Sequence, residues 1–145
     1  MANFVYNYGK FLLANGGVNL VTDNIVLMLV NSTYTGASAN ANSNVVSEVS
    51  SYEITATSYG RQTLTSKDIV EDDANTYAYF KAANVTFSSL GSGNTVGGAI
   101  LFKNTGSDAT SGLLAFYDIT DTPTNGGDIT IQWAADGSGG VLKLA

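Results

Sequence analysis

Three stretches of the chain are apolar at consecutive positions and do not alternate with polar residues. They are Ile25–Val30, Ala99–Phe102 and Leu113–Tyr117. A strand that is apolar on both faces is usually covered on both sides. Between the second and third stretches lies Lys103–Gly112, whose Asn, Gly, Ser, Asp and Thr residues are typical of a loop. The pattern therefore predicts a central β-hairpin over Gly97–Ile119 with other strands arranged around it.

Shorter segments on either side of this hairpin also have strand character. Asp128–Trp133 alternates strictly, with apolar side chains on one face and polar ones on the other. The other candidates are Tyr52–Tyr59, Gln62–Thr65, Thr76–Lys81, Asn84–Ser88 and Val141–Leu144. A total of about eight strands, roughly 8–15 residues apart, is typical of an all-β fold. We therefore predict a single antiparallel β-sandwich over residues 1–145, with either immunoglobulin-like or jelly-roll connectivity.

Polar segments between these strands predict the loops. The longest is Ser32–Ser51, within which Val45–Val49 has the pattern of one helical turn. Lys67–Asn75 and Thr120–Gly127 are shorter polar segments, and a last turn is expected over Ala134–Gly140. A loop as long as Ser32–Ser51 is uncommon in a small domain, so it is either a contact loop or a tolerated insertion.

The N-terminal segment predicts a short helix over Phe4–Ala14. The sequence Asn15-Gly16-Gly17 then ends it, because glycine adopts the left-handed conformation that terminates helices. Two interpretations remain open for residues 1–17: a helix that covers the core, or an arm that reaches a neighbouring subunit. The apolar face of this helix consists of Phe4, Tyr8, Phe11 and Leu12.

Composition narrows the chemistry that the chain can perform. It contains neither cysteine nor histidine, which excludes disulfides, thiolate or imidazole metal sites, and the Ser-His-Asp and Cys-His nucleophiles. Only 12% of the residues are charged, and the net charge is −6. The six basic residues are scattered, so no patch for nucleic acid is expected, and no apolar run is long enough to span a membrane. A polar but mostly uncharged surface is common in extracellular and virion β-proteins.

No motif in the sequence predicts a catalytic or cofactor site. Glu71-Asp72-Asp73 is the only acidic cluster, but three consecutive acids point in different directions and favour a solvated loop over a calcium site. Asp118 and Asp121 lie near a strand end, where a glycosidase could hold two carboxylates. A β-protein with twelve acids contains such pairs by chance, so this pair does not predict a glycosidase site. The glycines of Gly91–Gly97 have the wrong spacing for a dinucleotide loop. We therefore predict a protein that is not an enzyme and needs no cofactor or metal.

The eight tyrosines are the best candidates for contacts with a partner, because tyrosine combines apolar area with a polar group. Tyr34 and Tyr52 stand at the two ends of the long polar loop. Phe4 and Tyr8 join them as candidates if the N-terminal segment is an arm. Trp133 lies on the apolar face of its strand and is expected in the core.

Several phrases of this sequence, read together, resemble a group of small bacteriophage virion proteins. In that group a strand ending in a Ser/Asn-Ser-x-Tyr-Thr step precedes a variable polar loop, further strands, a central hairpin and a terminal Ile-x-Trp strand. Phe87 stands where the group often has tryptophan, and Tyr59-Gly60 reverses its Gly-Tyr order. The matching phrases are DNIVLMLVNSTYT (Asp23–Thr35), SEVSSYEI (Ser47–Ile54), YGRQTLTSK (Tyr59–Lys67), ANVTFSSL (Ala83–Leu90), Gly97–Ile119 and ITIQWAADGSGGVLKLA (Ile129–Ala145).

The resemblance implies a non-enzymatic virion building block that binds the major capsid protein or other virion proteins. Two placements compete, a decoration or cement protein on the outer surface of the head and a component of the tail or fibre. A net charge of −6 favours the outer surface, because packed DNA inside the head would repel it. A carbohydrate-binding module that uses exposed tyrosines is a further alternative from another class.

The apolar strands also bear on the oligomeric state. Ile25–Val30, Ala99–Phe102 and Leu113–Tyr117 require more cover than one short helix supplies. A second sheet or a neighbouring subunit would provide that cover, and leaving one face open would forgo on the order of 10 kcal/mol of apolar burial. The pattern favours a homo-oligomer, with a trimer as the preferred state.

Overall fold

The strands predicted from the sequence form an all-β fold in which every paired strand is antiparallel. The computed structural model describes residues 3–36, 38–133 and 140–144. One α-helix and two 3-10 turns accompany the strands. The elements are β1 (Phe4–Val5), α1 (Asn7–Asn15), β2 (Ile25–Asn31), η1 (Val46–Glu48), η2 (Ser50–Tyr52), β3 (Gln62–Thr63), β4 (Asp68–Asp72), β5 (Tyr77–Lys81), β6 (Val85–Phe87), β7 (Thr95–Lys103), β8 (Gly112–Pro123), β9 (Ile129–Ile131) and β10 (Leu142–Leu144).

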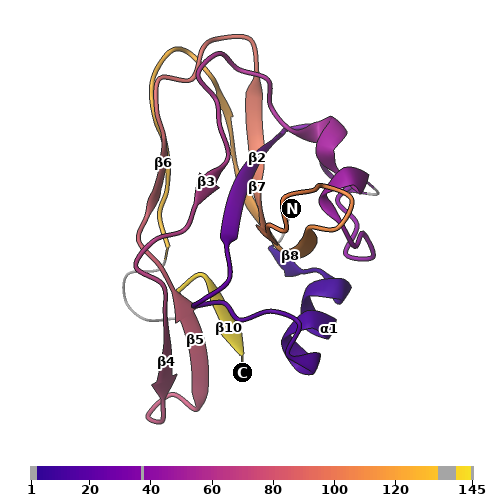
Figure 1. The fold of residues 1–145 in the computed structure, drawn as a ribbon. Coiled ribbons are helices and arrows are strands. Elements are labelled where there is room, and N and C mark those ends of the chain that lie inside the picture. Colours follow the sequence, from indigo (N-terminus) through magenta and orange to yellow (C-terminus); the bar gives the residue numbers. More distant parts are fainter. Residues whose placement is uncertain (1–2, 37, 134–139, 145) are drawn as a thin grey trace.

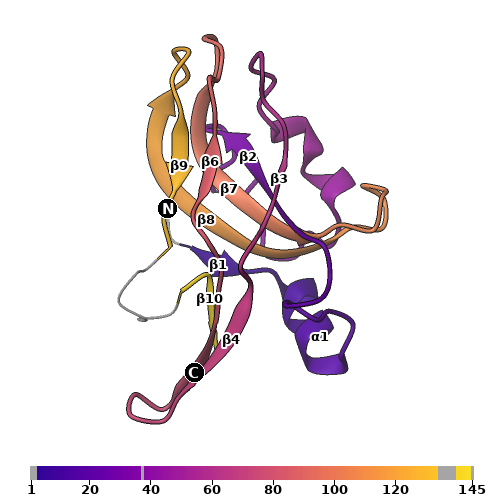
Figure 2. The same ribbon diagram turned by 60° about the vertical axis from the view of Figure 1, so that its left-hand side comes forward.

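The strands form a sandwich-like arrangement of one large sheet and two small ones. The large sheet has the order β1-β8-β7-β2-β3, and the small sheets have the orders β6-β9 and β10-β5-β4. In Figure 2, β6 and β9 lie in front of β7 and β8, and the β4–β5 hairpin projects downward from the body. The predicted central hairpin is confirmed, because β7 lies between β8 and β2 in the middle of the large sheet.

Residues of the same chain cover both faces of the central strands. Ile25 and Leu27 pack with Phe80 and Phe87 from the small sheets on one face. On the other face Met28 and its neighbours pack under the polar segment that follows β2. The six residues of the apolar run in β2 are at most 4% exposed. The two-sided apolar pattern therefore reflects cover by the same chain on each side, which favours the second-layer alternative as the source of that cover. The homo-oligomer stays a prediction.

The long polar segment after β2 forms the cover on that second face. Its backbone is held to β8 and the β7–β8 loop, since the Val46 amide donates to the Ser111 carbonyl at 3.0 Å and the Leu113 amide donates to the Asn44 carbonyl at 2.9 Å. The predicted helical turn is present as η1. Val46 and Val49 are fully buried and supply the apolar anchors. The segment is thus part of the core of this fold and not a loose insertion.

The N-terminal segment differs from the predicted helix at its start. Phe4 and Val5 form β1, where Phe4 pairs with Phe116 of β8, and α1 begins only at Asn7. The predicted stop is confirmed, because Gly16 adopts a left-handed φ of 74°. The helix lies on β8 of its own chain, and Gly9 of α1 approaches the backbone of Leu113 and Leu114. This contact favours the interpretation of a helix that covers the core.

Two polar segments that were predicted as loops contain strand. Lys67–Asn75 holds β4, which pairs with β5 although its side chains are largely exposed. An edge strand with solvent on both sides lacks the apolar alternation that identifies buried strands, so the pattern missed it. β8 also continues to Pro123, into the predicted loop Thr120–Gly127. Tyr52–Tyr59 forms only an isolated bridge at Glu53, and the turn expected over Ala134–Gly140 lies mostly outside the described residues.

Candidate functional site

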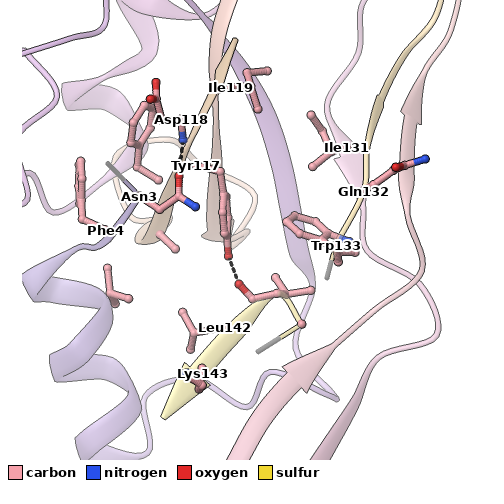
Figure 3. A pocket seen from close by; sticks show the side chains of 15 residues that line it. Asn3, Phe4, Tyr117, Asp118, Ile119, Ile131, Gln132, Trp133, Leu142 and Lys143 are labelled. Carbon is pink, nitrogen blue, oxygen red and sulfur yellow. Dashed lines mark hydrogen bonds between the residues drawn. The ribbon is translucent and has the colours of Figure 1, made fainter. Parts of the chain in front are cut away.

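An open groove of about 640 Å³ lies between β1 and β10. Figure 3 shows Tyr117 and Ile119 of β8 at its centre, with Asn3 and Phe4 on one side. Trp133 lies on the other side, and Leu142 and Lys143 of β10 lie below Tyr117 in this view. The groove is therefore bounded by side chains from both layers of the sandwich.

The strand order explains why a groove forms at this place. β1 is the last strand of the large sheet on one side, and β10 is the last strand of the three-stranded sheet. Among the described residues each therefore has a strand neighbour on one edge only, and residues of both strands line the same cavity. We call this cavity the edge groove. A free strand edge presents unpaired backbone N–H and C=O groups, which suits the binding of an extended segment.

The polar groups of the edge groove hold the chain together. The Tyr117 hydroxyl donates a hydrogen bond of 2.5 Å to the Val141 carbonyl, and the Asp118 amide donates to Asn3 Oδ1 at 2.8 Å. Trp133 is half-buried and its Nε1 donates to the Ala83 carbonyl at 3.0 Å. Burial raises the pKa of the Tyr117 hydroxyl, so it remains a neutral donor at neutral pH. None of these three contacts pairs a nucleophile with a base.

The strongest charged cluster lies elsewhere and joins three separate segments. Arg61 Nε and Nη2 donate to the two oxygens of Glu53 at 2.8 and 2.7 Å. Arg61 Nη1 donates to Asp108 Oδ1 at 2.7 Å, and Tyr59 donates its hydroxyl to Glu53 at 2.7 Å. The Arg61 guanidinium lowers the pKa of the Asp108 carboxyl, and burial raises the pKa of Tyr59. Because Arg61 and Asp108 are distant in sequence, no local pattern predicts this pairing.

The lowered pKa of Asp108 makes stability depend on pH in the acid range. The free energy of unfolding includes this contribution above about pH 4, the pKa of an unfolded aspartate, and loses it as the pH falls through the lower folded value. We expect the melting temperature to fall as the pH drops below about 4, and Arg61→Gln to flatten this fall. Thermal unfolding followed by circular dichroism measures both. Lys10→Gln, which makes the same change of net charge at an exposed helix position, should keep the full slope; equal slopes in both variants would contradict the assignment.

The structure places the predicted contact residues in two groups. Phe4, Tyr34 and Tyr52 come together in one aromatic cluster with Tyr6 and Phe116. Tyr34 is only 2% exposed, which corrects its prediction as a surface contact. Its aromatic area is covered because the polar loop that carries it folds over the large sheet.

The other three predicted residues retain some exposed surface. Phe4 and Tyr52 are half-buried at the margin of the aromatic cluster, and Phe4 also lines the edge groove. Tyr8 stands apart on α1, half-buried, with its ring stacked on Phe11 at 5.7 Å between centroids. Their contacts with a partner stay predictions. The edge groove itself was not predicted, because it depends on which strands end each sheet.

The buried hydroxyls of Tyr6 and Tyr34 form a hydrogen bond of 2.8 Å across the second face. We expect Tyr6→Phe to lower the free energy of unfolding by about 1 kcal/mol, since it removes this bond and leaves the ring in place. Urea unfolding measures the loss. The double variant Tyr6→Phe/Tyr34→Phe should cost less than the sum of the two single variants, because the second substitution removes the group left without its partner. Additive losses would mean that the two hydroxyls do not interact.

Two further expectations concern metals and membranes. Glu71 and Asp72 end β4, and Asp73 follows in the turn. Within residues 3–36, 38–133 and 140–144, no three acidic side chains lie close enough together to hold a metal ion. No helix in the same part of the chain has the length and apolar content needed to cross a bilayer.

Comparison with models of known protein families, with curated proteins and with solved structures gave no match.

Proposed function

We propose that this chain is a non-enzymatic structural protein of a bacteriophage particle and that it decorates the outer surface of the head. The observation that carries the proposal is the position of the ionisable side chains whose pKa is shifted. Arg61, Asp108 and Tyr59 brace loops against one another, and Tyr117 joins β8 to the segment before β10. Groups whose pKa is shifted for catalysis gather in a cleft beside a nucleophile or a base. Of these four groups only Tyr117 lines the edge groove, and its hydroxyl donates to a backbone carbonyl.

The resemblance to phage virion proteins supports the same conclusion. Its phrases fall on the elements that make up the fold: Asp23–Thr35 contains β2, Ala83–Leu90 contains β6, and Gly97–Ile119 forms most of β7 and β8. The similarity thus concerns the framework of the sandwich and the order of its strands. A structural role requires only such a framework and a surface that binds neighbours.

Charge supports the outer surface of the head as the place of binding. The net charge is −6, and acidic side chains such as Glu71 and Asp73 are exposed on the projecting hairpin. Inside the head these groups would face densely packed phosphates and would be repelled. On the outside they face solvent, where net charge keeps a protein soluble.

The experiment is a binding assay with heads of the phage whose genome encodes the chain. Heads that lack the protein are mixed with purified protein, sedimented and probed with a gold-labelled antibody. We expect label over the whole shell and a higher temperature of head disruption. Label confined to the tail or fibre would replace the proposed placement with the alternative one. An absence of binding to heads and tails alike would reject the virion role.

The carbohydrate-binding alternative depends on exposed tyrosines. Since Tyr34 is buried, Tyr52 alone remains of the pair that was expected to contact a glycan. This loss makes the alternative weaker than the virion role. Binding on a glycan array that disappears in Tyr52→Ala would favour it again.

A further inference from the structure

The β4–β5 hairpin projects from the body, and no strand of the described residues pairs with the outer edge of β4. β4 is the last strand in the order β10-β5-β4, and Figures 1 and 2 both show the hairpin extending away from the large sheet. Ile69, the second residue of this strand, is 48% exposed. Acidic side chains surround it, with Asp68 before it and Glu71 and Asp72 after it. An exposed edge strand with an apolar centre is a ready site for pairing with another strand.

The opposite edge of the same sheet carries the complementary features. β10 borders the edge groove through Leu142 and Lys143. Lys143 is exposed and contacts the Tyr77 ring at 4.8 Å, and it has no acidic partner among the described residues. Leu144, the next residue, is 58% exposed. This edge is therefore basic and apolar, whereas the β4 edge is acidic and apolar.

The register of the sheet decides which side chains would meet if the two edges paired. Ile69 pairs with Phe80, which pairs with Leu142, so these three share one face. Lys143 and Asp68 lie on the opposite face, because neighbouring residues of a strand alternate. If β4 of another copy is added beside β10, Ile69 can lie among Leu142 and Leu144 on one face. Asp68 and Asp72 then lie on the other face, on the same side as Lys143.

We propose that copies of this chain associate head to tail, with the β4 edge of one copy pairing with the β10 edge of the next at the edge groove. Charge selects a second copy in this orientation: two β4 edges would bring acids together, whereas β4 against β10 brings Asp68 and Asp72 toward Lys143. A head-to-tail contact uses two different surfaces and closes into a ring when the rotation allows it. The contact goes beyond the virion role, since a single copy could also decorate a head.

The experiment measures mass in solution by native mass spectrometry and light scattering over a wide range of concentrations. We expect a closed assembly of three or more copies for the full chain. Asp68→Lys and Lys143→Asp should each weaken association by about tenfold or more, because each places like charges together. The double variant Asp68→Lys/Lys143→Asp should restore assembly, since it exchanges the two charges. Lys10→Asp on α1 is the matched control and should assemble normally.

Three results would overturn the proposal. The first is a monomer at every concentration. The second is an assembly that neither charge variant weakens or that the double variant fails to restore. The third is a monomer whose binding to phage heads is lost in Lys143→Asp, because the edge groove would then hold a capsid protein. Circular dichroism of each variant checks that the sandwich has folded.

Discussion

Replacing Phe116 with alanine is expected to lower the free energy of unfolding by about 3–5 kcal/mol. The side chain is 1% exposed and packs on Phe4 and Tyr34, with ring centroids 5.2 and 5.4 Å apart. It also fills the space above Gly98, where an added Cβ would collide with the Phe116 ring. The alanine variant would therefore leave a cavity between β8 and the polar segment after β2.

Urea unfolding of Phe116→Ala, followed by tyrosine fluorescence, measures this loss. The matched control is Phe11→Ala, because Phe11 is 56% exposed on α1. We expect the control to change the free energy of unfolding by less than about 1 kcal/mol. Similar losses in the two variants would contradict the assignment of the polar segment to the core.

Gly9→Ala is the substitution with the second largest expected effect. It is expected to lower the stability of the chain, although the same substitution in a helix usually raises it. Alanine normally stabilises a helix by about 1 kcal/mol relative to glycine. Here an added Cβ would lie 2.6 Å from the Leu114 carbonyl oxygen and 2.8 Å from its Cα. Both are backbone atoms of a central strand and cannot move aside, so α1 must shift away from β8.

We expect Gly9→Ala to destabilise the chain by about 1–3 kcal/mol, as overpacking typically does. Thermal unfolding measures the change. Ala14→Gly, at an exposed position of the same helix, provides the comparison and should cost about 1 kcal/mol through helix propensity alone. A gain in stability from Gly9→Ala would mean that α1 does not lie on β8.

The central sheet could be predicted from the sequence because its signal is local and strong. Continuous apolar runs in β2, β7 and β8 reflect burial on both faces, and loop residues separate the two strands of the hairpin. β4 was missed since its acidic, exposed residues resemble a solvated loop, and only pairing with β5 makes it a strand. The same segment then supplies the edge used in the head-to-tail contact.

The features of the site depend on contacts between distant residues, which one sequence does not reveal. The edge groove exists because β1 and β10 each end a sheet, and strand order has no local signature. The burial of Tyr34 likewise follows from the folding of the polar segment over the large sheet, where Tyr6 meets it. Tyrosine at the end of a polar loop therefore predicted a contact surface where the structure has a core residue.

The covered sheet also changes the basis for expecting an oligomer. The apolar runs no longer require a neighbouring subunit, since both of their faces are buried within one chain. The remaining reason for self-association is the pair of complementary strand edges at β4 and β10. These edges are short and partly charged, so each contact is weak, and a ring would gain stability from its closure.

The most direct test of the structural role is the copy number of the protein in purified phage particles, measured by quantitative mass spectrometry against the major capsid protein. A decoration protein occurs in a fixed ratio to the capsid subunits, so we predict a ratio within about tenfold of one to one that is constant between preparations. Absence of the protein from the particles would contradict the proposed function.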